Sequence, residues 1–496
     1  MFDSFVLWGE WTPTWVVVLT VVLDIGIRVV MLGVVPGNRR PTTAMAWLLA
    51  IFFLPLVGLA LFLMLGNFRL SHRRIERQAE VNRRVLDATR HLDIDDSEYH
   101  APDWVKSALE LNRNLGAFPV LDGNTVEFIT GYKESVQAMT EAVKGAQRYV
   151  HVQFYIVGDD PEYVSPFLDA LEDAVARGVK VRMLFDHLGT LRVSGYRDLK
   201  RRLDAGGIDW RPMLPLAPVR KQWRRPDLRN HRKILVVDGE VAFTGSQNLI
   251  EPSYKRPGAR RAGREWVELM ARVRGPLVTS LDVVFATDWS QETDENLLLD
   301  MAEAPRPHPH PHGRTIGQIV PSGPGFEAEN NLRLFNTLIY SATERLSITS
   351  PYFVPDDSLL YALTTAAQRG VDVELFVSET GDQFMVHHAQ QSYYGALLKA
   401  GVKIYRYRTP MVLHSKCFTV DKEVAVFGSS NMDMRSFSLN LEVSVMLLGP
   451  EMVAEITQVQ NMYRHNSVRL TLKEWESRPL WNRWVDNVAR LSATLQ

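Results

Sequence analysis

The sequence predicts a mixed α/β protein that is built from two similar lobes and preceded by an N-terminal pair of membrane-spanning helices. Three observations support this prediction. A polar motif occurs twice, strand and helix patterns alternate in the same order before each copy, and two long apolar runs lie within the first seventy residues. With 496 residues, 46% of them hydrophobic, the chain is long enough for about two to four folded domains.

The composition narrows the classes of protein that remain. The formal net charge is −1, so the chain as a whole has no strong preference for an anionic partner. Its single cysteine, Cys417, excludes an intramolecular disulfide and a cysteine-rich zinc site. This cysteine usage is compatible with a reducing compartment.

The two apolar runs are typical of membrane helices. Residues 15–35 are apolar except for Asp24 and Arg28, and residues 42–66 carry no charge. About 20 apolar residues cross a hydrocarbon core of ~30 Å, so the second run is long enough to span. The first run either spans, with Asp24 and Arg28 paired on one helix face, or lies at the interface. We expect a membrane-anchoring hairpin over residues 1–70, and not a cleavable signal peptide, because the start lacks a basic region.

Basic residues predict the orientation of this hairpin. More of them follow the second run than lie between the two runs, and positive charge favours the cytoplasmic side. The segment after the second run carries Arg69, Arg73, Arg74, Arg77, Arg83 and Arg84, against Arg39 and Arg40 in the intervening loop. We therefore expect a multi-pass membrane protein with a basic juxtamembrane and linker helix region over residues 71–118 and cytoplasmic lobes beyond it.

Internal repeats predict the two lobes. "AQRYVHVQFYIVGDD" from Ala146 is similar to "ATERLSITSPYFVPDD" from Ala342, and "ARGVKVRMLFD" from Ala176 is similar to "AQRGVDVELFV" from Ala367. In the first copy the pattern predicts helices over residues 133–147 and 164–177 and strands over residues 149–157 and 179–185. Such alternation indicates α/β units with a parallel or mixed sheet. We place the lobes at residues 119–300 and 321–496.

A Pro- and His-rich stretch separates the lobes. "EAPRPHPHPHGR" alternates proline with His308, His310 and His312, which is typical of an exposed, extended linker. Metal binding by the histidines is the alternative, but a proline-stiffened strip does not easily close three imidazoles around one ion. We assign residues 301–320 to a linker.

The repeated motif carries the chemistry. "HRKILVVDGEVAFTGSQN" begins at His231 and "HSKCFTVDKEVAVFGSSN" begins at His414. Residues two apart on a strand share a face, so each copy presents a His and a Lys together, and the strand that returns after the turn brings a Ser and an Asn beside them. A single H-x-K pair would suit an exposed strand, but two copies of the whole pattern predict one pocket built for a phosphoryl group.

These motifs resemble those of the phospholipase D superfamily over residues 121–491. "SPYFVPDD" from Ser350, "GSSNMDMRSFSLNLEVSV" from Gly428 and the paired apolar runs resemble the bacterial cardiolipin synthases in particular. The resemblance implies two phospholipase D-like lobes related by pseudo-two-fold symmetry, in a bacterial plasma membrane. In "GREWVEL", Glu265 is the best acidic match to the family pattern, with Glu442 as its counterpart, although the order of residues departs from the usual one.

The resemblance also implies roles for the motif residues. His231 would be the nucleophile that forms a phosphatidyl-histidine, and His414 the acid and then the base, although the near symmetry allows the reverse. Lysines and polar side chains would hold the phosphate oxygens, and no metal or other cofactor is required. The candidate catalytic residues are His231, Lys233, Asp238, His414, Lys416 and Asp421; the candidate phosphate-binding residues are Ser246, Asn248, Ser429 and Asn431. For the two aspartates, position along the strand favours anchoring the turn or orienting the opposite motif over contact with phosphate.

The implied function is a cardiolipin synthase that joins two phosphatidylglycerols and releases glycerol. The expected partners are phosphatidylglycerol and the bilayer, and not nucleic acid; the oligomeric state is left open. Alternatives are another phospholipase D-type hydrolase or transphosphatidylase, a nuclease, and a non-enzymatic membrane scaffold. Two further segments have two interpretations each. The first segment forms either a lipid entrance or a solvated loop, and its basic residues are Arg220, Lys221, Arg224, Arg225 and Arg229. The second is an amphipathic C-terminal helix that either lies on a membrane or docks on the second lobe. Its apolar side carries Trp481, Trp484, Val485, Val488 and Leu491, opposite Arg483 and Arg490.

Overall fold

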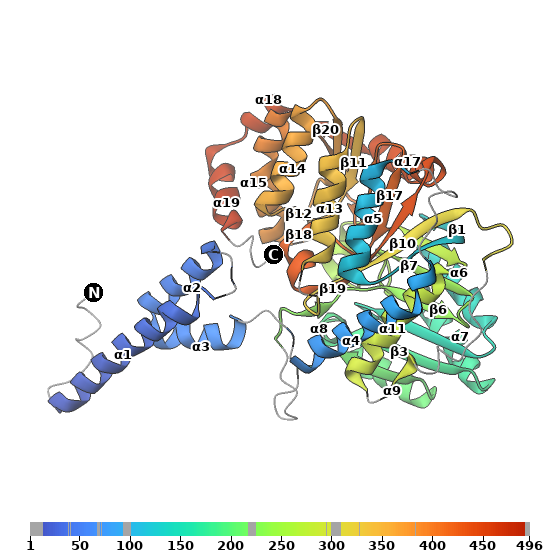
Figure 1. Ribbon diagram of the computed structural model, residues 1–496, viewed down its shortest axis with the longest axis horizontal. Helices are drawn as coiled ribbons and strands as arrows, with labels where there is room; N and C mark the ends of the chain where they lie inside the picture. Colours follow the sequence, from blue (N-terminus) through green and yellow to red (C-terminus); the bar gives the residue numbers. More distant parts are fainter. Residues whose placement is uncertain are drawn as a thin grey trace. The chain divides into compact units, whose positions relative to one another are not determined.

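The computed structural model describes residues 13–37, 39, 41–66, 70, 72–92, 101–216, 225–293, 295–298, 309–326, 328–381 and 383–491. The chain forms two compact units, Met1–Arg69 and Leu70–Gln496. The first unit is helical and the second is a mixed α/β body (Figure 1).

The described residues of the N-terminal unit form three apolar helices. They are α1 (Thr14–Val34), α2 (Pro41–Phe53) and α3 (Pro55–Leu65). Among the described residues, α1 is the one helix that is long and apolar enough to cross a membrane. Asp24 and Arg28 form an ion pair of 2.8 Å on α1, which is one of the two alternatives that the sequence left open.

The second apolar run is broken in the middle. Leu54 leaves the helical conformation (φ −133°, ψ 73°) and Pro55 begins α3. A proline inside a helix lacks the N–H that the preceding turn needs, whereas the first turn of a new helix tolerates it. With 13 and 11 residues, α2 and α3 are each shorter than the ~20 residues that a span requires. Residues 42–66 therefore form two short helices in place of the single spanning helix that was expected.

α2 and α3 fold back on each other. The rings of Trp47 and Phe62 meet edge to face, with centroids 5.5 Å apart. Arg39 holds the two ends of this pair beside the end of α1, because its Nη1 donates to Val35 O (2.8 Å) and its Nη2 donates to Gly66 O (3.0 Å). The second run thus begins and ends next to the same end of α1.

The strands of the body fall into two matching sets. The first set is β1 (Val120–Ile129), β2 (Tyr149–Phe154), β3 (Lys180–Asp186), β4 (Asp209–Met213), β6 (Ile234–Val237), β7 (Val241–Gly245) and β9 (Met270–Arg274). The second set is β10 (Thr315–Ser322), β11 (Arg345–Thr349), β13 (Asp372–Ser378), β14 (Lys403–Tyr407), β16 (Cys417–Val420), β17 (Val424–Gly428) and β19 (Asn440–Leu448), with β20 (Ser467–Leu470) added at the edge. The sequence repeats therefore correspond to repeated strands.

Both sets join one sheet, in which the described residues form 16 strands. The order is β4-β3-β2-β6-β7-β9-β1 in the first half and β14-β13-β11-β16-β17-β19-β10 in the second. β1 and β10 pair antiparallel at the centre. The β2–β3–β4 and β11–β13–β14 pairs are parallel, and the motif hairpins β6–β7 and β16–β17 are antiparallel. The mixed sheet and its pseudo-two-fold order confirm the predicted fold class.

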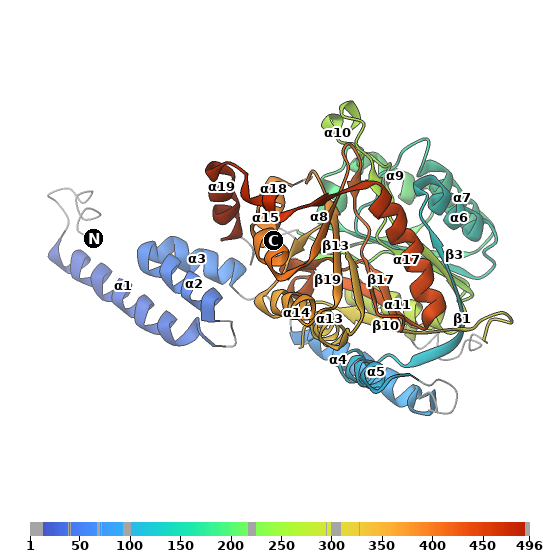
Figure 2. The same cartoon turned by 90° about the horizontal axis from the view of Figure 1, so that it is seen from above.

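Helices cover the sheet on both faces (Figure 2). The first half carries α6 (Tyr132–Lys144), α7 (Ser165–Ala176), α8 (His187–Leu191), α9 (Tyr196–Ala205), α10 (Pro257–Arg261) and α11 (Leu277–Glu292). The second half carries α13 (Asn330–Ser341), α14 (Asp357–Gln368), α15 (Phe384–Ala400), α16 (Met434–Ser438), α17 (Pro450–His465), α18 (Leu472–Glu476) and α19 (Leu480–Arg490). Separate cores lie under α6–α7 and under α13–α14–α15, whereas α11 and α17 share a third core that joins the two halves.

Segments that the sequence analysis placed outside the two lobes pack against the α/β body or form part of its sheet. α4 (His72–Ala88) contacts α11, where Arg74 is buried and ion-paired with Glu292 at 2.8 Å, and the short helix η2 (Arg90–Leu92) and α5 (Asp103–Gly116) follow. Residues 315–320, assigned to the linker, belong to β10 at the centre of the sheet. Residues 301–308, including His308, lie outside the described residues.

Candidate active site

Each motif histidine follows a two-residue strand that pairs with the opposite half of the sheet. The short strands are β5 (Arg229–Asn230), which pairs with Asn440–Leu441 of β19, and β15 (Val412–Leu413), which pairs with β8 (Trp266–Val267). The pairing continues by one residue: His231 N donates to Leu441 O and His414 N donates to Val267 O, both at 2.8 Å. Each half therefore brings its histidine next to the residue that directly follows the two paired residues of the other half, position 442 after Asn440–Leu441 and position 268 after Trp266–Val267.

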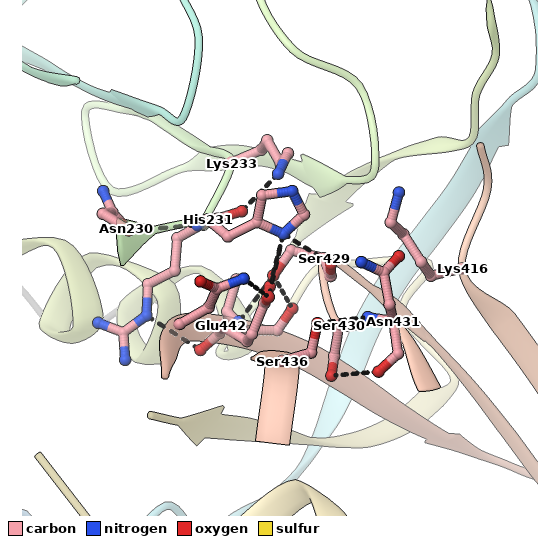
Figure 3. A network of polar contacts seen from close by, with 12 residues as sticks. Asn230, His231, Lys233, Lys416, Ser429, Ser430, Asn431, Ser436 and Glu442 are labelled. Carbon is pink, nitrogen blue, oxygen red and sulfur yellow. Dashed lines mark hydrogen bonds and ion pairs between the residues drawn. The ribbon is translucent and has the colours of Figure 1, made fainter. Parts of the chain in front are cut away.

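That following residue is a buried glutamate in both cases. His231 Nδ1 lies 3.0 Å from both carboxylate oxygens of Glu442, and His414 Nδ1 lies 2.7 Å from Oε1 of Glu268. Figure 3 shows the His231–Glu442 pair at the centre of a polar cluster drawn from both halves. Because Nδ1 contacts the carboxylate, the other ring nitrogen, Nε2, is the atom available for chemistry.

Glu268 was missed by the sequence analysis, and Glu265 does not occupy the expected place. Glu265 is exposed, and its backbone carbonyl accepts from Val412 N (2.9 Å). The matching patterns are "WVEL" and "NLEV", in which a glutamate directly follows the crossing pair and stands between apolar strand residues. This alternation makes Glu268 equivalent to Glu442. The loop that follows Asn248 is longer than the loop that follows Asn431, so the two glutamates lie at different distances from their motifs and the equivalence was missed.

The two lysines lie beside their histidines, as predicted. Lys233 Nζ donates to His231 O (2.5 Å), and Lys416 Nζ donates to His414 O (2.5 Å) and lies 3.2 Å from His414 Nε2. His231 and Lys233 directly precede β6, and Arg232 between them points the other way, to Asp288 (2.6 Å). The expected alternation therefore holds, although the residues are just outside the strand.

The serines of the motif hold the glutamates. Ser246 Oγ donates to Glu268 Oε2 and Ser429 Oγ donates to Glu442 Oε2, each at 2.5 Å. Each hydroxyl also accepts a backbone N–H at 2.9 Å, from Leu269 in one half and from Val443 in the other. Both serines thus fix the carboxylates that contact the histidines.

The two asparagines differ. Asn248 is occupied, since its Oδ1 accepts from Ile156 N (3.2 Å) and its Nδ2 donates to Tyr254 Oη (2.9 Å). Asn431 Oδ1 is buried without a hydrogen-bond partner, and Figure 3 shows this side chain beneath Lys416. Of the four predicted phosphate-binding side chains, Asn431 is the one with a buried polar atom still to be satisfied.

Asp238 and Asp421 were candidate catalytic residues, but the structure places them at hairpin turns away from the histidines. The Asp238 carboxylate accepts from the backbone N–H groups of Gln147, Arg148 and Tyr149 at 2.7–2.9 Å. Asp421 repeats this in the second half with the N–H groups of residues 343–345. Both aspartates stand at the hairpin turn with positive φ, 54° and 50°, at the end of the motif strand away from the histidine. They anchor the turn, as their position along the strand suggested.

Electrostatics distinguish the two histidine–glutamate pairs. Burial raises the pKa of Glu442 to about 7, whereas the pKa of Glu268 is lowered because His414 and Lys416 offset its burial. Burial, followed by the charge of Lys233, holds the pKa of His231 well below its usual value, and burial also lowers the pKa of His414, against the opposing charge of Glu268. Both imidazoles therefore favour the neutral form, His231 more strongly, and His414 is the one with a firmly anionic partner.

Tyrosines add a further asymmetry. Tyr155 packs edge-on to His231 (5.0 Å between centroids), and Tyr352 packs edge-on to His414 (6.2 Å). Tyr254 also contacts His414 and donates its hydroxyl to Glu268 Oε1 (3.1 Å). The equivalent residue of the second repeat is Phe437, which has no hydroxyl. There Asn440 Nδ2 donates to Glu442 Oε1 (3.2 Å), so the additional donor is a phenol at Glu268 and an amide at Glu442.

Three further features are the basic segment before the first motif, the single cysteine and the possible metal ligands. Arg220, Lys221 and Arg224 lie outside the described residues, while Arg225 is ion-paired with Asp227 and Arg229 is buried against Asp186. Cys417 is a buried strand residue, and burial raises the pKa of its thiol to about 12. In the part of the chain that the structure describes, no group of three or more His, Cys, Asp or Glu side chains is arranged to hold a metal ion.

Known proteins share this sequence pattern and fold. Residues 139–289 and 335–463 match the family model described as "Cardiolipin synthase, PLD-like domain", and residues 15–67 match "Phospholipase_D-nuclease N-terminal". The chain is 34% identical to cardiolipin synthase A of Proteus mirabilis over 461 residues, which cover 91% of this chain and 92% of the relative. It is 35% identical to cardiolipin synthase A of Yersinia pseudotuberculosis over 464 residues, covering 92% and 93%. The crystal structure of phosphatidylserine synthase from Haemophilus influenzae shares the fold, with a TM-score of 0.59 at 15% identity over 79% of this chain and 99% of that one.

Proposed function

The chain belongs to the cardiolipin synthases with phospholipase D-like domains and is a phosphatidyltransferase that acts on phospholipids, and from this premise we propose that it transfers a phosphatidyl group between two phosphatidylglycerols through a phosphohistidine. The observation that carries the proposal is the crossed pairing of His231 with Glu442 and of His414 with Glu268. Two imidazoles, each oriented through Nδ1, supply a nucleophile and an acid–base group in one site.

In the first step, Nε2 of His231 attacks the phosphorus of one phosphatidylglycerol. The P–N bond forms as the P–O bond to the head-group glycerol breaks, and His414 gives its proton to the departing glycerol oxygen. The low pKa of His231 supports the nucleophile assignment, because the attacking nitrogen must carry a lone pair. The anionic Glu268 supports the acid assignment, because it stabilises the imidazolium form of His414.

In the second step, the now neutral His414 takes the proton of the glycerol hydroxyl on a second phosphatidylglycerol. The oxygen of that hydroxyl attacks phosphorus, the P–N bond breaks, and His231 leaves as a neutral imidazole. Atoms and charge balance over the two steps, with cardiolipin and glycerol as products. A histidine intermediate keeps the energy of the phosphodiester bond for the second alcohol.

Lys233, Lys416 and Asn431 would hold the non-bridging phosphate oxygens. Burial keeps the pKa of Lys233 well below its usual value in the site as described. A phosphodiester anion beside the ammonium group would raise that pKa again, so substrate binding and lysine protonation are coupled. The unsatisfied Asn431 Oδ1 marks the amide that is placed to reorient toward a ligand.

The N-terminal unit would hold the enzyme in the plasma membrane. The apolar helix α1 has the length of one span, and the arginines of α4 favour a cytoplasmic position for the body. Two of these arginines also bind the body, since Arg74 pairs with Glu292 and Arg77 donates to Ser290 O. The proposed cytoplasmic position of the body therefore depends on the other arginines of α4.

One assay tests the proposal directly. Purified protein is incubated with phosphatidylglycerol that is labelled in an acyl chain, and cardiolipin, glycerol and phosphatidic acid are measured. Cardiolipin and glycerol in equal amounts are expected. Phosphatidic acid as the main product would identify a hydrolase instead, and cardiolipin that forms only with a different second lipid would change the acceptor.

A further inference from the structure

The last helix of the body presents its apolar side away from the protein. Exposed apolar residues of α19 lie at Leu480, Trp481, Trp484 and Val488, with exposed fractions of 79%, 66%, 55% and 41%. At about 100° per residue, these four side chains occupy one sector of α19. The indoles of Trp481 and Trp484 stack with centroids 4.7 Å apart, so they form one continuous surface.

The opposite side of α19 is fixed to the body by polar contacts. Asp486 is buried and its carboxylate contacts His388 Nδ1 (2.7 Å) and Arg478 Nη2 (2.8 Å). Ala489 is also buried, and α19 lies along α15 in both views (Figures 1 and 2). A helix on the surface of a soluble body usually buries its apolar side. Here the order is reversed, because the buried side is polar or small and the apolar side is outward.

The start of α15 extends this surface toward the site. Phe384 is 67% exposed and Met385 is 43% exposed, and Phe384 contacts His388, the residue that anchors α19. We call Phe384, Met385, Leu480, Trp481, Trp484 and Val488 the apolar platform. Gln383, directly before it, donates to Tyr352 Oη (3.3 Å), and Tyr352 packs against His414. Two residues, Gln383 and Tyr352, therefore separate the platform from the candidate acid–base histidine.

The charged side chains of α19 indicate what kind of surface the apolar platform contacts. Among the ionic side chains of α19, Asp486 is buried and paired, whereas Arg483 is partly exposed and Arg490 is exposed. The accessible charge of the helix is therefore positive. A helix with tryptophans on one side and arginines on the other is the combination that lies at the boundary between acyl chains and anionic head groups.

We propose that the apolar platform is the surface by which the catalytic body rests on an anionic phospholipid bilayer, independently of the N-terminal helices. The proposal rests on the proposed function in that the bilayer lipid is the substrate. Contact at the platform places His414 near the head-group level, so a phosphatidyl substrate reaches the histidines without leaving the bilayer entirely. The platform has the composition of an interfacial helix and borders the site, which favours a bilayer over a second copy of this chain.

The test places a fluorophore on the platform of the full-length protein. Val488→Cys is labelled with bimane, and Met462→Cys on α17, where Met462 is 46% exposed, serves as the matched control. The buried Cys417 stays unlabelled. In vesicles that contain phosphatidylglycerol, we expect nitroxide-labelled lipid to quench the label at position 488 and aqueous iodide to quench the label at position 462.

The other outcomes overturn the proposal. Quenching of position 488 by iodide would mean that the platform stays in water, and protection from both quenchers would mean that protein covers it. The readout does not depend on turnover, so a failed cardiolipin assay in detergent micelles would remove the proposed function and leave the quenching result intact.

A second variant links the platform to catalysis. Trp481→Ser combined with Trp484→Ser should lower the ratio of vesicle turnover to mixed-micelle turnover by about tenfold, because two interfacial anchors are lost. Met462→Ser should leave this ratio unchanged. An unchanged ratio in the double tryptophan variant would contradict a role in access to bilayer substrate.

Discussion

His231 and Glu442 come from opposite halves of the sheet, yet the imidazole Nδ1 lies 3.0 Å from each carboxylate oxygen. The same crossing brings His414 to Glu268. Neither half contains both members of a pair, so each half completes the site of the other. This arrangement explains why the chain carries the motif twice: one lobe alone would present a histidine without the carboxylate that orients it.

The first prediction uses the different pKa values of the two glutamates. Glu442→Gln should lower kcat/KM by about 10²-fold above pH ~7, because the charge that orients His231 is lost. The defect relative to the wild type should shrink as the pH falls through about 7, because the pKa of Glu442 is about 7 and the wild-type carboxyl then becomes neutral as well. The measurement is kcat/KM of both proteins across this pH range.

Two variants serve as controls for this prediction. Glu268→Gln should show a defect that is constant between roughly pH 6 and pH 8, because the pKa of Glu268 is lowered and the carboxylate stays ionised throughout. Glu265→Gln should retain activity within about twofold, as expected for an exposed surface side chain. A pH-independent defect in Glu442→Gln would show that Glu442 is already fully ionised at pH ~6.

The second prediction separates the turn aspartates from the catalytic residues. Asp238→Asn should lower the stability by about 1–3 kcal/mol, because the carboxylate accepts three backbone N–H groups. Asparagine tolerates the positive φ of this position, so backbone strain is not added. The melting temperature should therefore fall, while the single-turnover rate of the folded protein stays within about threefold. A loss of several orders of magnitude in that rate, at unchanged stability, would return Asp238 to the catalytic set.

The sequence predicted the parts of the site that depend on local spacing. His231 and Lys233 lie two apart and do point together, and the hairpin after Asp238 returns Ser246 as expected. The sequence did not reveal which carboxylate each histidine meets. That contact depends on the pairing of β5 with β19 and of β15 with β8, two-residue strands with no periodicity of their own. Such pairing is set by the packing of the two halves.

The same reasoning applies to the fold. Alternating strands and helices predicted both lobes, but a parallel or mixed sheet gives no local sign that two lobes will share it through β1 and β10. In the N-terminal unit, the uncharged composition of residues 42–66 suggested one span, and the decisive residue was Pro55, which begins a new helix. Composition measures affinity for lipid, whereas the proline determines where the helix ends.

The third prediction tests the folded-back helices of the N-terminal unit. Trp47→Cys combined with Phe62→Cys should form a disulfide on mild oxidation, because the two side chains are in contact in the folded-back pair. In a continuous helix the same positions would be ~22 Å apart, beyond the reach of any disulfide. Mass spectrometry of the oxidised full-length protein in vesicles provides the measurement. Trp47→Cys combined with Trp15→Cys, on the far part of α1, is the control that should stay reduced.

The last prediction distinguishes the two histidines. If His231 is the nucleophile and His414 the acid, His414→Ala should still react with a phosphatidyl substrate that has a good leaving group, because such a group departs without protonation. A phosphatidyl adduct should then accumulate on His231, since no base remains to activate the acceptor hydroxyl. His231→Ala should form no adduct with any substrate. With natural phosphatidylglycerol each single change should cost several orders of magnitude, and the double change little more, because the two residues act as a unit.

Mass spectrometry of the trapped protein locates the adduct. An adduct on His414 in His231→Ala would exchange the two roles, and the pKa argument for a neutral His231 would then have pointed to the wrong residue. The absence of an adduct from both variants, with cardiolipin synthesis intact in the wild type, would favour direct attack by the acceptor alcohol over a covalent intermediate. In that case the crossed histidine–glutamate pairs would act as acid and base on the two alcohols, and Glu442→Gln and Glu268→Gln would still differ in their pH dependence, because the burial and charge around each carboxyl do not depend on the route.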